Sequence, residues 1–169
     1  MHFLNLALRI NPKKYKVCNR FCKLHNKSIK YQFMVNLEHI GIAVKSLEES
    51  NKLFEKLLNA SPYKIETVAS EQVTTSFFKT GDSKVELLEA TAPESPIAKF
   101  IEKKGEGIHH LAFAVSDIRS EIARLKADGF TILNEEPKKG ADNKWVCFLH
   151  PKSTNGVLIE LCQEREPGQ

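Results

Sequence analysis

At 169 residues, the chain is long enough for one well-buried domain and a tail, and its hydrophobic (41%) and charged (27%) contents are ordinary for a globular protein. The net charge of +4 is unevenly spread: residues 1–33 hold eight Lys or Arg and no acid, so the remainder holds 17 basic and 21 acidic residues. A body with a net charge of −4 and no nucleic-acid motif is not expected to bind nucleic acid.

Residues 1–33 form the basic part of the chain. No apolar run approaches the roughly 20 residues that span a membrane, and no secretory signal is recognisable. The segment has the charge of a mitochondrial transit peptide but is poor in Arg and Ser. We therefore expect either a disordered basic tail or a tail that is not native, in which case the true start is Met34. The four cysteines form no Cys-x-x-Cys motif, which favours reduced thiols and a cytoplasmic protein; the mitochondrial matrix is the alternative if residues 1–33 are a transit peptide.

From residue 34 onward, hydrophobic patterns predict ordered elements. Asn36–Val44 alternates and is rich in Ile and Val, as strands are. Ser46-x-x-Glu49 is a capping box that opens a helix. The apolar residues of this helix recur at helical spacing: Leu47, Leu53, Phe54, Leu57 and Leu58. Three strand-like runs follow, with a Gly81-Asp82 turn before the last: Lys64–Ala69, Val73–Lys79 and Lys84–Glu89.

The same order of elements recurs in the second half. Gly107–Val115 is typical of a strand, and Ser116 or Asp117 caps a helix. The apolar positions of that helix are Ile118, Ile122 and Leu125, and strands are expected near Phe130–Leu133, Trp145–Leu149 and Val157–Cys162. A short helix and a glycine-rich segment, "ESPIAKFIEKKGEG", separate the copies. We predict one domain over residues 34–166, built from two copies at about 35–92 and 107–163.

Aligning the two copies pairs four residues that carry chemistry. "LEHIGIAV" lies over "IHHLAFAV" without a gap, which places His39 on His110. "VELLE" lies over "IELCQ", which places Glu86 on Glu160. Because a repeated fold can place equivalent positions around a pseudo-twofold axis, two histidines and two glutamates can converge.

Strand parity supports this convergence. His39 shares its strand face with Gly41 and Ala43, which leaves room in front of the imidazole. Glutamates among apolar neighbours need a partner, and a divalent metal supplies one while keeping positions open for substrate oxygens. Taken singly, a His in a strand is usually a hydrogen-bonded polar residue and a Glu in a strand usually faces solvent. The prediction of a metal site therefore depends on the alignment that pairs two His and two Glu across the copies. Four further residues are expected outside the ligand set, the last two in solvent: His109, His150, Glu38 and Glu89.

Three stretches carry a family likeness: "LEHIGIAV", "SPIAKFIEKKGEGIHHLAFAV" and "FLHPKSTNGVLIEL". Over residues 35–163 the chain resembles the vicinal oxygen chelate (glyoxalase/bleomycin-resistance/dioxygenase) superfamily, and within it the methylmalonyl-CoA epimerase family. The resemblance implies an α+β fold in which two tandem βαβββ units form a curved mixed sheet around a metal site. It also implies an acyl-CoA substrate and a homodimer, and no membrane partner.

The resemblance further implies a ligand set and a reaction. The metal would be held by His39, Glu86, His110 and Glu160, although the Glu86 position is Gln in some epimerases. The implied ion is Co²⁺, with Mn²⁺, Ni²⁺ or Zn²⁺ as alternatives. The implied reaction interconverts the R and S forms of methylmalonyl-CoA by a 1,1-proton transfer through an enolate, with Glu160 as one acid–base group.

Two features depart from the pattern or stay open. Some family members place a glutamate on the strand that corresponds to Val73–Lys79, whereas "VTTSFFK" has none; Glu71 is nearby but off the matching position. A water or another residue would then be the second acid–base group. The loop "HPKSTNG" offers Lys152 and Ser153 to coenzyme A phosphates, or is a plain turn.

Two other functions fit the same residues. One is a glyoxalase I-like lyase or another metal-dependent enzyme of the superfamily. The other is a metal-free protein of this fold that binds small molecules. An extradiol dioxygenase is disfavoured, because such an enzyme uses two His and one carboxylate on iron and this chain offers four ligands.

Overall fold

A computed structural model of the chain describes residues 36–166, which form one eight-stranded sheet and three α-helices. The predicted tail, residues 1–33, and its two cysteines lie outside the described residues, so the predicted domain boundaries stay a prediction. The elements of the first copy are β1 (Asn36–Ala43), α1 (Leu47–Leu58), β2 (Lys64–Val68), the short 3₁₀ helix η1 (Ala69–Glu71), β3 (Val73–Thr80) and β4 (Ser83–Ala90). None of the helices in this part of the chain is long and apolar enough to cross a membrane.

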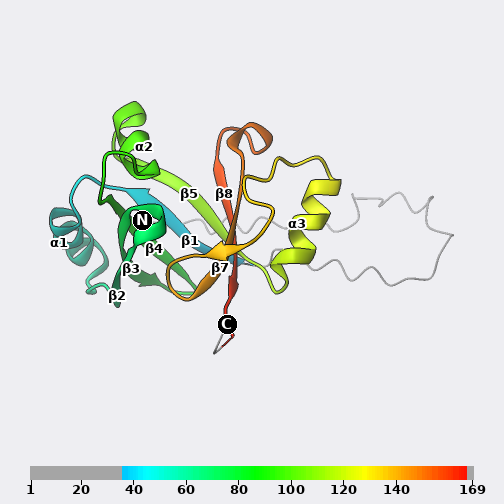
Figure 1. The fold of residues 1–169 in the computed structure, drawn as a ribbon. Helices are drawn as coiled ribbons and strands as arrows, with labels where there is room; N and C mark the ends of the chain where they lie inside the picture. The colour runs from blue at the N-terminus through cyan, green and yellow to red at the C-terminus, as the bar shows by residue number, and fades with distance from the viewer. Residues whose placement is uncertain (1–35, 167–169) are drawn as a thin grey trace, which may run out of the picture. The chain divides into compact units, whose positions relative to one another are not determined.

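The second copy repeats this order after a linking helix, α2 (Pro96–Lys104). Its elements are β5 (Gly107–Ala114), α3 (Ile118–Ala127), β6 (Lys138–Lys139), β7 (Lys144–Leu149), the 3₁₀ helix η2 (Pro151–Ser153) and β8 (Leu158–Glu164). Figure 1 shows β1 and β5 crossing the middle of the fold, with α1 and α3 on opposite sides of them. The α+β fold with two tandem βαβββ units is therefore confirmed.

The strand order is β2-β3-β4-β1-β5-β8-β7-β6. From either edge to the centre, each copy contributes its second, third, fourth and first strand in that order. β1 pairs antiparallel with β5 at the centre, and each of them pairs parallel with the last strand of its own copy, β4 or β8. An approximate twofold axis therefore lies between β1 and β5. The sheet is mixed, and the two central strands bring the equivalent positions of the copies together.

The helices begin where the sequence predicts. The hydroxyl of Ser46 accepts the N–H of Glu49 (3.3 Å), and the carboxylate of Asp117, rather than Ser116, accepts the N–H of Ser120 (3.0 Å). These contacts satisfy backbone groups that the first helical turn leaves free. In α2, the hydroxyl of Ser95 plays the same part for Ile97.

Two expectations about local structure are wrong. The predicted apolar face of α1 is too wide, because Leu53 and Leu57 are 63% and 69% exposed and the helix meets β3 and β4 through Leu47, Phe54 and Leu58. The predicted strand at Phe130–Leu133 is reduced to one bridge between Ile132 and Leu149.

The second error has a clear cause in the side chain of Asn134. Its Oδ1 accepts the N–H of Phe148 (2.9 Å) and its Nδ2 donates to the carbonyl of Val146 (3.2 Å). The side chain thus occupies the backbone groups of β7 that a longer strand would need. The edge strand forms further on, at Lys138–Lys139.

α1 and α3 cover one face of the sheet, one helix in each copy. The largest core cluster packs α3 against β7 and β8 through buried residues: Ile118, Ile122, Leu125, Cys147, Leu149 and Leu161. The equivalent cluster of the first copy packs α1 against β3 and β4. Cys147 and Cys162 are free, buried thiols. On the opposite, inner face, Ile97 of α2 packs with Ala43, Val73 and Leu88, and the polar residues of the candidate site lie beside this cluster.

Leu161→Ala should lower the free energy of unfolding by about 2–5 kcal/mol, because Leu161 is fully buried in the α3 cluster and the truncation leaves a cavity. Urea denaturation measures this change. Leu53→Ala is the matched control, since Leu53 is 63% exposed, and it should change stability by less than about 0.5 kcal/mol. Equal effects of the two substitutions would contradict the packing described above.

Candidate active site

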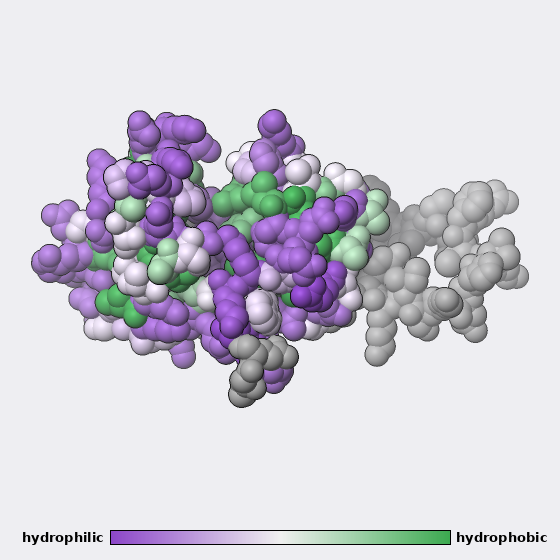
Figure 2. Space-filling model, in the orientation of Figure 1, coloured by the Kyte–Doolittle hydropathy of each residue, from purple (hydrophilic) through white to green (hydrophobic). Residues whose placement is uncertain are grey.

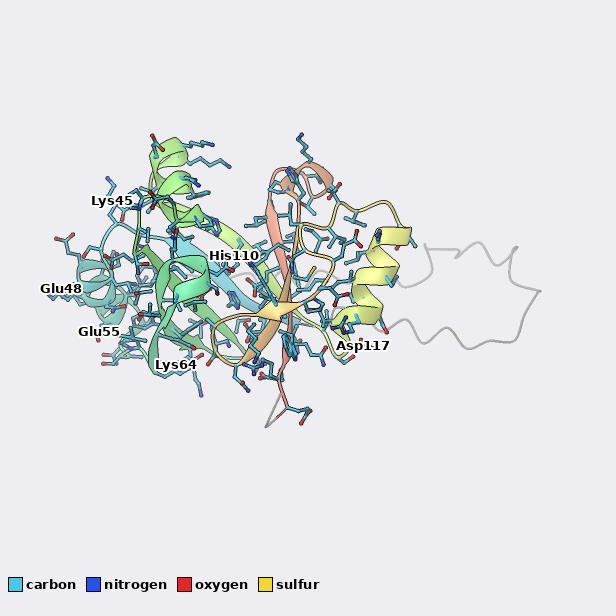
Figure 3. The ribbon with its side chains drawn as sticks, in the orientation of Figure 1. Lys45, Glu48, Glu55, Lys64, His110 and Asp117 are labelled. Atoms are coloured by element: carbon cyan, nitrogen blue, oxygen red, sulfur yellow. The ribbon has the colours of Figure 1, made fainter. Side chains whose placement is uncertain are left out.

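Two histidines meet at the approximate twofold axis. β1 carries His39 opposite Ala112 and β5 carries His110 opposite Gly41, so both rings extend from the centre of the sheet. The two Nε2 atoms lie 2.9 Å apart, and the ring planes are nearly perpendicular, at 81°. Both side chains are buried, and Figure 3 shows His110 in the middle of the fold, far from the labelled charges of α1.

Gly41 provides the space for one of these rings. A Cβ atom built on Gly41 would lie 2.2 Å from Cε1 of His110, a distance that no real contact reaches. The small residue that strand parity singled out is therefore confirmed as a requirement, but it makes room for the histidine of the other copy.

Two glutamates complete the cluster from the neighbouring parallel strands. Glu86 on β4 lies beside Gly41, and Glu160 on β8 lies beside Ala112. Glu86 Oε2 is 3.2 Å from Nε2 of His39 and 3.4 Å from Nε2 of His110, and Glu160 Oε2 is 3.9 and 3.4 Å from the same two atoms. All four residues are at most 6% exposed. The structure thus brings together the four residues that the sequence pairs.

These separations suit a divalent metal ion. Ligand atoms about 2.1 Å from one ion lie about 3.0–3.4 Å apart when they are neighbours in octahedral or tetrahedral coordination. Three of the four imidazole–carboxylate distances fall in this range. Two imidazoles and two carboxylates can hold Co²⁺, Mn²⁺, Ni²⁺ or Zn²⁺, and the donor set does not choose among these ions.

His39, Glu86 and Glu160 differ in their hold on protons. Burial would lower the pKa of His39, but hydrogen bonds to Glu38 and Glu86 and the charges of Glu86 and Glu160 raise it to about 10. Although burial opposes it, hydrogen bonds from the two histidines lower the pKa of Glu86. The pKa of Glu160 is instead raised, mainly by burial. The two carboxylates, equivalent in the repeat, therefore differ in basicity.

Glu38 is not in solvent, contrary to expectation. Its carboxylate contacts Nδ1 of His39 and Nζ of Lys84 and lies 3.2 Å from Nζ of Lys144. Burial would raise the pKa of Glu38, but the hydrogen bonds with His39 and Lys84 lower it to about 2. A carboxylate on the far nitrogen of a ligand histidine fixes the ring orientation and leaves Nε2 free for the metal.

A β-bulge explains why the alternation of strand faces wrongly predicts that Glu38 lies in solvent. Leu37 pairs with Phe113 and His39 with Ala112, so Glu38 is an extra residue with no partner in β5. The opposite strand has the matching irregularity, because Gly41 pairs with His110 and Ile42 with Ile108, which leaves His109 extra. A bulge re-aims the side chain of the extra residue, and both residues turn toward the histidine that follows. The sequence contains one indication of these bulges, because the alignment of the two copies pairs Glu38 with His109, and both are polar residues directly before a site histidine.

A second cluster near the site is a poorer metal centre. Donor atoms of Glu38, His39 and Cys162 also lie within reach of one ion. Burial raises the pKa of the Cys162 thiol, which disfavours the thiolate that a metal binds. Glu38 is already paired with lysines. The other group of donor atoms within reach of one ion, formed by His39, Glu86 and His110, is therefore the better candidate for a metal centre.

A cavity lies in front of His39, Glu86, His110 and Glu160. It is lined by residues from both copies. On β3, the hydroxyl of Thr75 donates to Oε1 of Glu86 (2.7 Å). Glu71 lines the cavity and is paired with Lys138 (2.6 Å). In the loop before β8, the hydroxyl of Ser153 bonds to Thr131 and His150, as in a plain turn, and Lys152 does not line the cavity.

Residues 38–148 match the model of the Glyoxalase/Bleomycin resistance protein/Dioxygenase superfamily. This chain belongs to that superfamily. The Ethylmalonyl-CoA/methylmalonyl-CoA epimerase of Cereibacter sphaeroides is 41% identical over 75% of this chain and 96% of its own length. The mitochondrial methylmalonyl-CoA epimerase of Dictyostelium discoideum is 40% identical over 74% of this chain and 76% of its own length.

A solved structure gives the same answer. The methylmalonyl-CoA epimerase of Streptomyces coelicolor, as a variant in complex with 2-nitronate-propionyl-CoA, superposes with a TM-score of 0.74. It is 31% identical, and the match covers 76% of this chain and 94% of that one. Within the superfamily, the chain thus belongs with the methylmalonyl-CoA epimerases. These proteins are isomerases, and the chain is an enzyme of that class.

Gly41→Ala should displace the ring of His110 and weaken Co²⁺ binding by about tenfold or more. The overpacking should also lower the free energy of unfolding by about 1–3 kcal/mol. Calorimetric titration with Co²⁺ and urea denaturation measure the two effects. Gly81→Ala is the control, because a Cβ there meets no atom although the positive φ of 69° strains it. Unchanged Co²⁺ affinity in Gly41→Ala would contradict the placement of His110 in the site.

Proposed function

We propose that this protein interconverts the R and S forms of methylmalonyl-CoA with the help of one divalent metal ion. The observation that carries the proposal is the convergence of two imidazoles and two carboxylates in one buried cavity. The epimerase relatives support the choice of reaction, and the acyl-CoA compound in the Streptomyces structure supports the class of substrate. The name of the Cereibacter relative adds ethylmalonyl-CoA as a second substrate to test.

The chain supplies the ligands for this chemistry. His39, Glu86, His110 and Glu160 would hold the ion, and Glu38 would orient His39 through its Nδ1. An ion bound there would act as a Lewis acid and stabilise the negative charge that develops on the thioester oxygen of the enolate. Co²⁺ is the ion proposed, with Mn²⁺, Ni²⁺ or Zn²⁺ as alternatives.

Glu160 is the proposed acid–base group that removes the proton of carbon 2. Its raised pKa makes it the stronger base of the two site carboxylates. Its Oε2 faces His110, which leaves Oε1 for the proton. Glu86 is unsuited to this role, because its Oε1 already accepts the hydroxyl of Thr75 and its pKa is lowered. When two carboxylates in one site have different pKa values because their environments differ, they can take different roles in the reaction.

Inversion also requires a proton to return from the other face of the enolate. β3 offers Thr75 instead of an acid, and the remaining acids on the cavity wall are each bound to lysine: Glu38, Glu71 and Asp142. We assign this step to water beside Glu71 and Lys138. Water as the donor means that the proton removed from carbon 2 is not conserved in the product.

Other properties of the protein stay predictions. Homodimer formation and the absence of nucleic-acid and membrane partners are proposed from the sequence. For the location in the cell, the cytoplasm is proposed. The Dictyostelium relative is mitochondrial by name, which keeps the matrix as the alternative.

The test is proton NMR of methylmalonyl-CoA in deuterated water with the full chain, with and without Co²⁺. The proton of carbon 2 should exchange for deuterium only with metal present, and each inversion should place deuterium at that carbon. Glu160→Gln should slow the exchange by about 10²–10⁴-fold, the usual contribution of a general base. Glu55→Gln on α1, far from the labelled His110 in Figure 3, is the control and should not change the rate.

The outcomes separate the competing functions. No exchange with any of the four ions would overturn the epimerase proposal. Turnover of the methylglyoxal–glutathione hemithioacetal in its place would favour the glyoxalase I-like lyase. A protein that binds no ion and leaves both compounds unchanged would favour the metal-free binding protein.

A further inference from the structure

Each site histidine has a second ring nitrogen that meets the residue before it in the chain. Nδ1 of His39 contacts the carboxylate of Glu38, and Nδ1 of His110 lies 3.0 Å from Nδ1 of His109. Glu38 and His109 are the two bulged residues, one in each copy. The same backbone irregularity therefore supplies both partners, but one partner is a carboxylate and the other is an imidazole.

The bulge is what allows His109 to reach His110. In a regular strand, neighbouring side chains point to opposite faces of the sheet. Here Gly41 pairs with His110 and Ile42 with Ile108, so His109 is the extra residue and its side chain is re-aimed. The two rings meet edge to face, with planes 83° apart and centroids 5.2 Å apart. The contact between the two histidines is thus a product of the backbone and not of sequence adjacency alone.

Helix α2 holds the other side of the His109 ring. The ring centroids of Phe100, on this helix, and His109 lie 5.0 Å apart, with the planes at 86°. Phe100 packs against the buried cluster that contains Ile97, whereas Figure 2 shows mostly hydrophilic side chains on the outward side of α2. His109 lines the cavity of the site and also a second cavity beside α2. Its ring is therefore fixed between Phe100 and His110.

The positions of the ring protons follow from these contacts. Nε2 of His110 lies 3.4 Å from Oε2 of both Glu86 and Glu160, so it is the nitrogen that would bind an ion, and it must then be free of a proton. A neutral imidazole with a free Nε2 carries its proton on Nδ1. Two N–H groups cannot hydrogen-bond to each other. Nδ1 of His109 must therefore be the acceptor, and the proton of His109 lies on its Nε2.

We infer that His109 is a positioning residue whose Nδ1 accepts a hydrogen bond from Nδ1 of His110. This bond fixes the orientation of the His110 ring and selects the tautomer whose Nε2 can bind an ion. The role rests on the proposed function, because it requires an ion at the site. It belongs to a residue that the sequence predicts outside the ligand set.

An imidazole in this place adds no charge to the site. The carboxylate of Glu38 is matched by its contacts with Lys84 and Lys144. His109 is a neutral acceptor, and so it orients His110 without adding to the negative charge of the nearby site carboxylates, as a second bulged carboxylate would. The two ligand histidines are therefore oriented by partners of different charge.

The test compares two variants of the full chain that differ in whether position 109 offers an acceptor. His109→Asn places its amide oxygen where Nδ1 stood, one bond from Cγ, and can accept the Nδ1–H of His110. His109→Leu has the same shape but a methyl group there. His109→Leu should raise the Kd for Co²⁺ by about 10–100-fold, the usual cost of losing such a partner, and His109→Asn should recover most of that loss. Calorimetric titration measures the Kd, and thermal melting checks that both variants are folded.

A packing role alone would give the opposite order. If His109 only filled the space beside Phe100, the apolar Leu would replace it better than the polar Asn. Equal Kd values for the two variants, or tighter binding by His109→Leu, would therefore overturn the inference. The same pair of substitutions at His150 is the control, because His150 lines neither cavity, and His150→Asn and His150→Leu should bind Co²⁺ equally.

Nitrogen NMR of the histidine rings tests the proton positions without any substitution. In the parent protein loaded with diamagnetic Zn²⁺ at neutral pH, His110 should carry its proton on Nδ1 and His109 on Nε2. The two rings are distinguished by sequential assignment from their backbone amides. A proton on Nδ1 of His109 would overturn the inference even if neither variant folds.

These readouts separate the role of His109 from the proposed reaction. A weaker Kd in His109→Leu than in His109→Asn without exchange at carbon 2 supports the role and removes the reaction. Exchange at carbon 2 with equal Kd values for the two variants keeps the reaction and overturns the role. A parent protein that binds neither Co²⁺ nor Zn²⁺ also overturns the role, because His110 would then not be a ligand.

Discussion

The antiparallel pairing of β1 with β5 is the constraint on which the rest of the site depends. This pair lies on the approximate twofold axis and brings Nε2 of His39 to 2.9 Å from Nε2 of His110. β4 and β8 pair parallel with its two outer edges and add Glu86 and Glu160. The arrangement of these four residues is therefore a product of strand order, and a Cβ atom on Gly41 would collide with the ring of His110.

Two bulges break the symmetry of this arrangement. Each copy inserts one extra residue before its ligand histidine and turns it toward the site, but the residues differ in charge. Glu38 is held by lysines and orients His39, whereas His109 lies between two cavities. The two bulges thus place a carboxylate beside His39 and an imidazole beside His110. The two site carboxylates diverge as well, since the pKa of Glu86 is lowered and that of Glu160 is raised.

The sequence predicts whatever depends on periodicity and repetition. The two copies and the helix caps follow from the spacing of apolar and capping residues. The four paired residues of the candidate site follow from the alignment of the two copies. The alternation of strand faces predicts Glu38 in solvent because it assumes an unbroken ladder of paired residues, whereas a bulge depends on the partner strand. The prediction of a strand at Phe130–Leu133 is wrong because the side chain of Asn134 occupies backbone hydrogen-bonding groups of β7.

The claim that four residues hold one divalent ion is tested most directly by anomalous X-ray diffraction from crystals of the protein grown with Co²⁺. The account predicts a single cobalt peak within about 2.0–2.2 Å of Nε2 of His39, Nε2 of His110 and carboxylate oxygens of Glu86 and Glu160. A cobalt ion bound instead by Glu38 and Cys162, or an ordered protein without cobalt between the two histidines, would contradict it.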